Sequence, residues 1–313
     1  MAVDLKEKQI MKILITGATG LIGTELVSLL LQNGIAVHYL TTSKKKISNE
    51  PNFKGFIWNP EQGQIDENCL MGVDAIIHLA GASIAKRWTR SYKQEIIESR
   101  ILSSNLLFKA LKNNPNQVTQ IVSASAIGIY PDSLKNVYTE DHKNADDGFL
   151  GNVVAKWEES VDKFKLLNLK VCKLRTGIVL SNKGGALMEM ARPIKFGVGS
   201  PFGTGRQMQS WIHIHDLAEL YFYAIKNQWH GIYNAVAPNT VTNKELVATI
   251  AKTLKKPLFM PNIPEFIMQL LLGEMHEVLF SSQNVSSRKA VGDGFVFKYA
   301  TVKKAIENLL ANS

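Results

Sequence analysis

The sequence predicts an α/β fold: a doubly wound parallel sheet with helices on both faces, followed by a smaller C-terminal α/β domain. Short apolar runs alternate with helical patterns through the first 180 residues. The first apolar run, at 12–15, ends in a glycine turn that leads directly into a helical pattern. Beyond residue 180 this alternation stops, and loops containing glycine and proline separate shorter elements.

The elements of the first half follow from their apolar patterns. Continuous apolar runs are typical of strands buried on both faces of a parallel sheet, and amphipathic stretches between them are typical of crossover helices. Trp58 falls in a weaker extended piece. The predicted strands cover 12–15, 36–40, 74–79, 119–123 and 169–175, and the predicted helices cover 21–32, 89–112 and 149–166.

The second half has a different character. We expect a loop with a short helix at 184–205 and a strand followed by a helix at 211–226. Further helices are predicted at 242–254, 264–272 and 301–311, with extended segments at 257–260 and 295–297. The predicted division is an N-terminal extension (1–10), a nucleotide-binding domain (11–180, also receiving about 210–235) and a C-terminal substrate domain (181–209 and 236–313).

Composition narrows the class of protein. The chain has 313 residues, of which 45% are hydrophobic and 20% charged, as in ordinary globular proteins. Cys69 and Cys172 lie far apart without a metal-binding spacing, which favours a reducing, cytoplasmic environment. No apolar run has transmembrane length, so no membrane association is expected. The net charge of +9 favours anionic ligands, but no nucleic-acid-binding motif accompanies it.

The glycine turn predicts a dinucleotide site. A strand, three glycines spaced three apart and a helix place free backbone N–H groups at a helix N-terminus, where the dipole favours an anion. Glycine also lets the backbone approach a pyrophosphate closely. The residues expected to contact the cofactor here are Gly17, Thr19, Gly20, Leu21, Ile22 and Gly23.

The end of the second strand predicts which dinucleotide binds. A site selective for NAD usually has an acidic residue here to hold the ribose 2′-hydroxyl, and this chain has none. Instead, the hydroxyls and lysines of the run Thr41–Lys46 can hold a 2′-phosphate, which favours NADP(H) over NAD(H); the alternative is a solvated surface loop. The residues concerned are Thr41, Thr42, Ser43 and Lys44.

A third strand end contributes to the same edge. Leu79, Ala80 and Gly81 follow the strand at 74–79, and small residues at the carboxyl edge of a parallel sheet are where a ligand is expected. His78 lies inside the apolar run, so we expect it to be a packed strand residue.

Several motifs together resemble the short-chain dehydrogenase/reductase superfamily, extended type. Ser123–Tyr130 is similar to the serine-bearing strand end of sugar-nucleotide epimerases, and Gly203–Gln207 with Trp211–Leu217 is similar to a later signature. A narrower resemblance, to the group called the epimerase family, covers nearly the whole chain from Met11. It rests on Arg87-Trp88-Thr89, Ser99-Arg100-Ile101, Leu174–Leu180, Gly184–Leu187, Ser210–His213, Asn234–Pro238 and Gly294–Phe297.

This resemblance implies a Rossmann domain and a catalytic Tyr-x-x-x-Lys helix. The tyrosine is the general acid or base, the lysine lowers its pKa and holds the nicotinamide ribose, and a serine orients the substrate oxygen. Ser125 and Lys156 match the serine and the lysine, but Asn152 stands where the tyrosine is expected. An amide cannot exchange a proton near neutral pH, so Tyr130 and Tyr138 are considered as substitutes.

Other residues complete the predicted site. Glu95 and Arg100 are assigned to the cofactor, the alternative being an ion pair on the helix surface. Val179, in the matching motif at 174–180, joins them by resemblance. His213 and His215 alternate in a predicted strand, without a third ligand, and Asp216 is the expected N-cap of the next helix, so no metal is predicted. The substrate is assigned to Arg87, Trp88, Tyr130, Arg206 and Gln207.

Two functions are consistent with these residues. The first is an NADP(H)-dependent oxidoreductase or epimerase that acts on a small carbonyl or nucleotide-sugar-like substrate without the usual tyrosine. The second is a non-catalytic protein that senses NADPH and signals to a partner. Extended members of the superfamily often form homodimers through two long helices, which are predicted here at 89–112 and 149–166.

Overall fold

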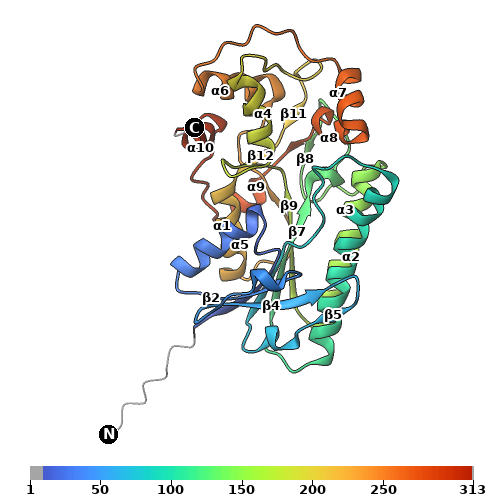
Figure 1. Cartoon of the computed structure of the whole chain (residues 1–313), viewed down its shortest axis with the longest axis vertical. Helices are drawn as coiled ribbons and strands as arrows, with labels where there is room; N and C mark the ends of the chain where they lie inside the picture. The colour runs from blue at the N-terminus through green and yellow to red at the C-terminus, as the bar shows by residue number, and fades with distance from the viewer. Residues whose placement is uncertain (1–9, 312–313) are drawn as a thin grey trace.

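A large, mostly parallel sheet organises the computed structural model, which describes residues 10–311 (Figure 1). The predicted extension at 1–10 therefore lies, except for residue 10, outside the described residues. The strand order is β13-β9-β7-β6-β1-β2-β4-β3, with β5 paired to β4. The strands are β1 (Lys12–Thr16), β2 (Ala36–Thr41), β3 (Asn49–Glu50), β4 (Phe53–Asn59), β5 (Gln64–Ile65), β6 (Ala75–His78), β7 (Gln120–Ala126), β9 (Lys170–Thr176) and β13 (Gly231–Ala235).

The strand order creates a crevice beside β1. All the pairings from β13 through to β4 are parallel, and only β3 and β5 run antiparallel to β4. The chain winds outward from β1 through β2 to β4, then returns to β6 on the other side of β1 and winds outward again. Parallel sheets bind ligands outside the carboxyl ends of their strands at such a reversal. The predicted doubly wound fold class is confirmed.

Two helical layers cover the sheet. Helices α1 (Leu21–Gln32) and α5 (Ile214–Lys226) pack together, and their Leu26 and Leu217 belong to one buried cluster that includes β1. Helices α2 (Arg90–Asn113) and α3 (Phe149–Asp162) pack together in a second cluster, which includes Leu107 and Trp157. Figure 1 shows the two helix pairs on opposite sides of the sheet.

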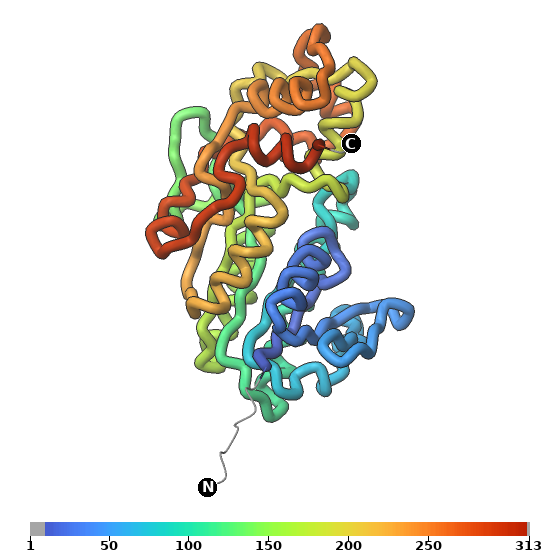
Figure 2. The backbone as a smooth tube through the Cα atoms, turned by 90° about the vertical axis from the view of Figure 1, so that its left-hand side faces the viewer, coloured from blue at the N-terminus to red at the C-terminus, as the bar shows by residue number. Residues whose placement is uncertain are grey.

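Most of the remaining elements stand above the carboxyl edge of the sheet (Figure 2), whereas α9 (Arg288–Gly292) packs against the edge strand β13. Helix α10 packs against α6, and Trp211 and Ile306 share a third buried cluster. Three short strand pairs connect this part to the sheet: β10–β12, β11–β14 and β15–β8. The bounds are β8 (Val137–Tyr138), β10 (Ile178–Leu180), α4 (Ala186–Lys195), β11 (Met208–Gln209), β12 (Trp211–His213), β14 (Val241–Thr242), α6 (Asn243–Thr253), α7 (Glu265–Leu272), α8 (Glu277–Phe280), β15 (Asn284–Val285), α9 (Arg288–Gly292) and α10 (Val302–Leu310).

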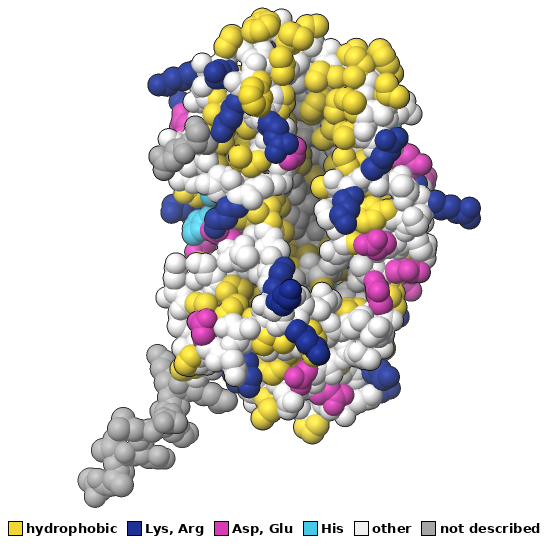
Figure 3. All heavy atoms as spheres, viewed as in Figure 1, with side chains coloured by type: hydrophobic (Ala, Val, Ile, Leu, Met, Phe, Trp, Pro, Cys, Tyr) yellow, Lys and Arg dark blue, Asp and Glu magenta, His cyan; other side chains and the backbone are white. Residues whose placement is uncertain are grey.

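A groove runs down the front of the molecule, and hydrophobic side chains gather on its upper walls (Figure 3). Helix α7 accounts for much of this apolar surface, since none of its residues is buried. Its most exposed side chains are Phe266, Leu270 and Leu271. The groove separates the C-terminal elements on its two sides and descends towards the sheet.

Several predicted elements differ in the structure. Trp58 belongs to a full strand, β4, and the segments 257–260 and 295–297 are not strands. His213 is the N-cap of α5 and His215 lies in its first turn, so the two do not share the face of a strand. Asp216 is not the N-cap, because its carboxylate accepts the backbone N–H groups of Lys298 (3.1 Å) and Tyr299 (2.9 Å). The Asp216 carboxylate, which the local pattern assigned to capping α5, is therefore used in a long-range contact with the segment at Lys298 and Tyr299.

The close packing of α1 on the glycine turn predicts the effect of Gly23→Ala. A Cβ at Gly23 would lie 2.2 Å from the Gly17 carbonyl oxygen and 2.6 Å from the Ala18 Cα, both of them backbone atoms. We expect this overpacking to lower the free energy of unfolding by about 1–3 kcal/mol, measured by urea denaturation. Gly292→Ala is the control, since nothing lies within 4 Å of its added Cβ. Equal stability of the two variants would contradict the prediction.

Candidate functional site

The glycine turn leaves the N-terminus of α1 open. Gly17 has φ +73°, and a Cβ there would lie 3.1 Å from the carbonyl carbon of Leu79. Gly20, the N-cap of α1, donates its N–H to the Gly17 oxygen (3.0 Å) and offers no capping side chain. The first turn of α1, which contains Leu21, Ile22 and Gly23, carries no acidic residue. An anion can therefore approach these N–H groups closely.

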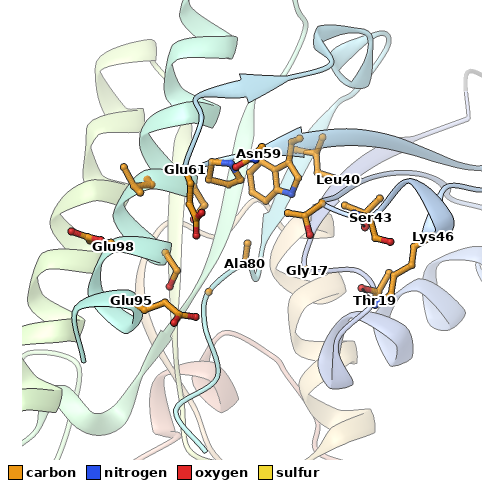
Figure 4. A pocket seen from close by; sticks show the side chains of 18 of the residues that line it. Gly17, Thr19, Leu40, Ser43, Lys46, Asn59, Glu61, Ala80, Glu95 and Glu98 are labelled. Carbon is orange, nitrogen blue, oxygen red and sulfur yellow. Dashed lines mark hydrogen bonds between the residues drawn. The ribbon is translucent and has the colours of Figure 1, made fainter. Parts of the chain in front are cut away.

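A cavity of about 650 Å³ lies beside this turn, where the strand order reverses. Figure 4 shows Gly17 and Ala80 deep in it, Lys46, Ser43 and Thr19 on one side, and Glu95 and Glu98 on the other. Eight of the predicted cofactor residues, from four separate segments, meet here. Those that line the cavity are Gly17, Thr19, Thr41, Thr42, Ser43, Ala80, Gly81 and Glu95.

Of the lysines in the predicted 2′-phosphate segment, Lys46 lines the cavity and Lys44 does not. The Lys46 Nζ donates a hydrogen bond to Thr19 Oγ1 (3.4 Å) on the same side of the cavity. The buried Tyr39 fixes this turn, because its hydroxyl donates to the Lys46 carbonyl (2.6 Å) and accepts from the Ser48 N–H (2.7 Å). The short 3₁₀ turn Lys44–Lys46 that results directs its last lysine to the cavity.

Sequence reasoning found only part of the cavity wall. On α2 it selected Glu95 alone. Ser91, Glu98 and Leu102 also line the cavity and share a helix face with Glu95, because these residues are three or four positions apart along the chain. This helical spacing was the signal that could have identified them. No local sequence pattern indicates that the end of β4 lines the cavity, because only the tertiary fold brings this strand end to the cavity wall. The other lining residues that were missed are Leu40, Trp58, Asn59, Pro60, Glu61, Gln94, Ser99 and Ser103.

A buried hydrogen-bond network fixes the end of β6. His78 is fully buried, with Nδ1 2.8 Å from Thr16 Oγ1 and Nε2 3.1 Å from Ser104 Oγ, so its prediction as a packed residue is confirmed. Burial lowers the pKa of His78 to about 4, which keeps it neutral. Thr16 Oγ1 also accepts the N–H groups of Leu79 (3.1 Å) and Ala80 (3.0 Å). The loop over the cavity floor is thereby held to β1.

The predicted catalytic serine lies in a buried charged network. Ser125 is 3% exposed, and its hydroxyl donates to Glu158 Oε1 (2.6 Å). Arg175 binds the same carboxylate with two hydrogen bonds, from Nε to Oε1 (2.8 Å) and from Nη2 to Oε2 (3.0 Å). Lys173 Nζ lies 3.5 Å from Oε2 and 2.9 Å from an oxygen of Asp162. The Ser125 hydroxyl is therefore committed to an internal carboxylate.

The structure does not bring Asn152 and Lys156 to Ser125. Both side chains are exposed on α3, whereas Glu158, which contacts Ser125, is buried. Residues two apart on a helix point about 200° away from each other, so Lys156 faces away from the Ser125 side. Lys156 does not line the cavity. Ser125 hydrogen-bonds Glu158 and, among the described residues, neither Asn152 nor Lys156, so the arrangement of the three as one catalytic group stays a prediction that this contact does not support.

Neither substitute tyrosine is available to a substrate. Tyr130 and Tyr138 are each 1% exposed and stack on one another with ring centroids 5.1 Å apart. The Tyr130 hydroxyl donates to Asn234 Oδ1 (2.7 Å) and accepts from Arg175 Nη1 (3.0 Å). Burial is the main cause of a raised pKa at Tyr130, which opposes proton release. The assignment of Tyr130 to substrate is corrected to a packing role.

The other substrate candidates divide between packing and surface. Trp88 is buried against Phe149, and Gln207 donates from Nε2 to backbone oxygens of the C-terminal region, so both assignments are corrected to structural roles. Arg87 is exposed and lies beside Gly273, at the end of α7. Arg206 is exposed in its loop. These two arginines remain predictions as substrate contacts.

Arg100 and Val179 lie next to the cavity without lining it. Arg100 is 9% exposed, and its guanidinium packs behind Gly81. Val179 lies in β10, close to Gly185, which in turn approaches Leu21 at the start of α1. Their assignment to the cofactor remains a prediction.

Comparison with known proteins identifies the family. The NAD dependent epimerase/dehydratase family matches residues 13–152, and a domain of unknown function, DUF1731, matches residues 263–309. An epimerase family protein of Staphylococcus saprophyticus is 37% identical over 298 residues, which cover 95% of this chain and 98% of that protein. The epimerase family protein YfhF of Bacillus subtilis is 35% identical over 303 residues, covering 96% and 99%. The chain belongs to the epimerase family.

A solved structure of the epimerase family supports the same assignment. The human epimerase family protein SDR39U1 (isoform 2), solved with NADPH, superposes with a TM-score of 0.84 at 29% identity. The match covers 97% of this chain and 100% of the human chain. The predicted resemblance is thereby confirmed, and with it membership of a family that binds nicotinamide dinucleotides.

Among residues 10–311, no three histidine, cysteine, aspartate or glutamate side chains come together in a way that could hold a metal ion. Within the same range, no helix combines the length and the apolar character needed to cross a membrane.

The buried Glu158 predicts an acid-sensitive step in stability. Burial alone would raise the pKa of its carboxyl, but the hydrogen bonds and charge of Arg175, with Lys173 and Ser125, lower the pKa below its ordinary value. A lowered folded-state pKa stabilises the fold above the ordinary carboxyl value, and this stability is lost as pH falls through the folded value. We expect Glu158→Gln to lose about 3–5 kcal/mol of unfolding free energy near neutral pH.

Chemical denaturation between about pH 5 and about pH 3 measures this effect. The wild-type protein should lose stability more steeply with acid than Glu158→Gln does. Glu307→Gln is the control, because Glu307 pairs with Lys303 at 3.9 Å on the surface and should change stability little. The same acid dependence in wild type and Glu158→Gln would exclude Glu158 as its source.

Proposed function

We propose that this protein binds NADP(H) in the cavity and uses it as the redox cofactor for a small carbonyl or nucleotide-sugar-like substrate. The observation that carries the proposal is the juxtaposition of an uncapped α1 N-terminus with a β2 end that bears hydroxyls and Lys46 but no acidic residue. Such a pair of sites suits the diphosphate and the ribose 2′-phosphate of NADP(H).

The residues present fit this cofactor. Gly17 and Gly23 allow the turn to pack tightly, since a Cβ at either position would meet backbone atoms. Without side chains at Gly17, Gly20 and Gly23, a pyrophosphate can approach the backbone N–H groups closely. Thr42, Ser43 and Lys46 would hold the 2′-phosphate through charge-assisted hydrogen bonds. The NADPH found in the human family member supports the same assignment.

The protein's own residues would bind and orient rather than relay protons. When bound, the nicotinamide supplies or accepts a hydride. Ser125 is committed to Glu158, and Tyr130 and Tyr138 are buried, so the usual serine–tyrosine–lysine relay has no counterpart among the described residues. The proposed chemistry therefore relies on positioning the substrate at the cavity, with its proton coming from another donor.

The second candidate function is a non-catalytic NADPH sensor. The internal use of Ser125 favours it, since a cofactor site is present while the expected proton donor is absent. Oxidation of NADPH by members of a panel of aldehydes, ketones and nucleotide sugars would support the enzyme. Tight NADPH binding, without turnover of any member, would support the sensor.

Titration with NADPH and NADH tests cofactor selectivity. Because a charged hydrogen bond contributes about 1.5–3 kcal/mol, Lys46→Ala should weaken NADPH binding by about 10- to 100-fold. NADH lacks the 2′-phosphate, so its affinity should be unchanged, as measured by nicotinamide fluorescence. Lys44→Ala is the matched control, from the same 3₁₀ turn but not on the cavity wall. Equal wild-type affinity for NADPH and NADH would contradict the assignment.

Ser125→Ala separates a structural from a catalytic serine. Losing its hydrogen bond to Glu158 should lower the unfolding free energy by about 1–3 kcal/mol. NADPH affinity, and any turnover found in the substrate panel, should stay within twofold of wild type. A variant of unchanged stability whose turnover is abolished would restore Ser125 to the catalytic site.

A further inference from the structure

Arg100 is a buried cation without a counter-ion. Its side chain projects from α2 towards α3, and the residue is 9% exposed. Nη1 donates to the Ile96 carbonyl of its own helix (2.8 Å), but Nε is buried and has no hydrogen-bond partner. No carboxylate lies within 4.0 Å of it in the described part of the chain. A charge held this way is costly unless something else neutralises it.

A second unsatisfied donor lies beside it. The Arg100 Cζ is 4.9 Å from the centre of the Trp157 ring. Trp157 Nε1 is also buried without an acceptor. Buried donors are nearly always paired in proteins, so two neighbouring orphans point to an acceptor that arrives from outside the chain. Arg175 differs from Arg100 in this respect, since each of its three guanidinium nitrogens donates a hydrogen bond to Glu158 or Tyr130.

Gly81 leaves a path from the cavity to this guanidinium. A Cβ at Gly81 would lie 3.1 Å from Arg100 Cγ, 3.2 Å from Cζ and 3.4 Å from the orphan Nε. Gly81 does not have a positive φ, so its backbone does not itself require glycine. Gly81 lines the cavity, as do Ser99 and Ser103, which flank Arg100 on α2. The missing side chain keeps the guanidinium uncovered on the cavity side.

From these contacts we infer that Arg100 forms an oxyanion-binding site behind Gly81, which receives a negatively charged oxygen of a ligand bound in the cavity. The oxygen belongs either to the diphosphate of the dinucleotide or to an anionic or developing oxyanion of the substrate. The inference rests on the proposed function only in taking the cavity as the cofactor site. Burial lowers the pKa of Arg100 to about 10, so the guanidinium remains charged at neutral pH.

The main test compares Arg100→Met with Lys109→Met. The first variant removes the buried charge and keeps an unbranched side chain, and the second removes an exposed charge from the same helix. We expect the melting temperature of ligand-free Arg100→Met to equal or exceed that of wild type, because an uncompensated charge is gone. We expect at least tenfold weaker binding of the anion, while Lys109→Met stays within twofold of wild type.

Three titrations distinguish the sources of the oxygen. If Arg100→Met weakens NADPH tenfold and leaves adenosine 2′-monophosphate unchanged, the oxygen belongs to the cofactor diphosphate. If NADPH affinity is unchanged but oxalate no longer binds to the NADPH complex, the oxygen belongs to the substrate. If wild type binds no NADPH, the proposed function fails, and inorganic pyrophosphate then decides, since only a protein with Arg100 should bind it.

A purely structural arginine would give a different result. It would lower the melting temperature of Arg100→Met and leave all of these affinities unchanged, which would overturn the proposal. If Arg100→Met does not fold, Gly81→Ala decides, because it keeps the charge and covers the guanidinium with a methyl group. Anion binding at least tenfold weaker in folded Gly81→Ala supports the site, and wild-type affinity in that variant overturns it.

Discussion

The approach of α1 to the glycine turn sets the geometry on which the rest of the site depends. Gly23 lies so close to the Gly17 carbonyl that no larger residue fits, and this contact seats the helix directly on the end of β1. The helix N-terminus then opens onto the crevice between β1 and β6, where the strand order reverses. Thr16 and His78 hold the next loop to the same strand, so the cavity floor has little freedom to move.

A second constraint acts where a proton relay is expected. The bidentate pair of Arg175 and Glu158 ties β9 to α3, and Ser125 completes it from β7. This pair fixes the rotation of α3 about its axis and so turns Asn152 and Lys156 towards solvent. A buried ion pair with satisfied hydrogen bonds is a specific device for fixing orientation. The carboxylate of Glu158 thus both positions α3, through Arg175, and accepts the hydrogen bond of the Ser125 hydroxyl.

Local sequence predicted the fold well and located the glycine turn that lies beside the cavity. Strand-length apolar runs placed β1, β2, β6, β7 and β9, because burial on both faces leaves a continuous apolar pattern. The spacing of Gly17, Gly20 and Gly23 located the phosphate cradle, because a close backbone approach admits only glycine. These features depend on neighbours along the chain, which is why the sequence reveals them.

Other features depended on residues distant in the sequence. The choice of Lys46 over Lys44 follows from the Tyr39 hydroxyl, and the burial of Trp88 follows from α3 and the C-terminal segment around Met275. Asp216 looked like a local cap but binds backbone groups more than eighty residues away.

The amino-acid sequence by itself therefore determined the fold class and the glycine turn, which are encoded in short-range periodicity and spacing, and its motifs carried the resemblance to the family. Only the tertiary structure decided that Ser125 hydrogen-bonds Glu158, that Tyr130 is inaccessible and that Arg100 is a buried cation with no counter-ion among the described residues. Those outcomes depend on which side chains share a low-dielectric interior, and burial and pairing are properties of the packed chain rather than of any one segment.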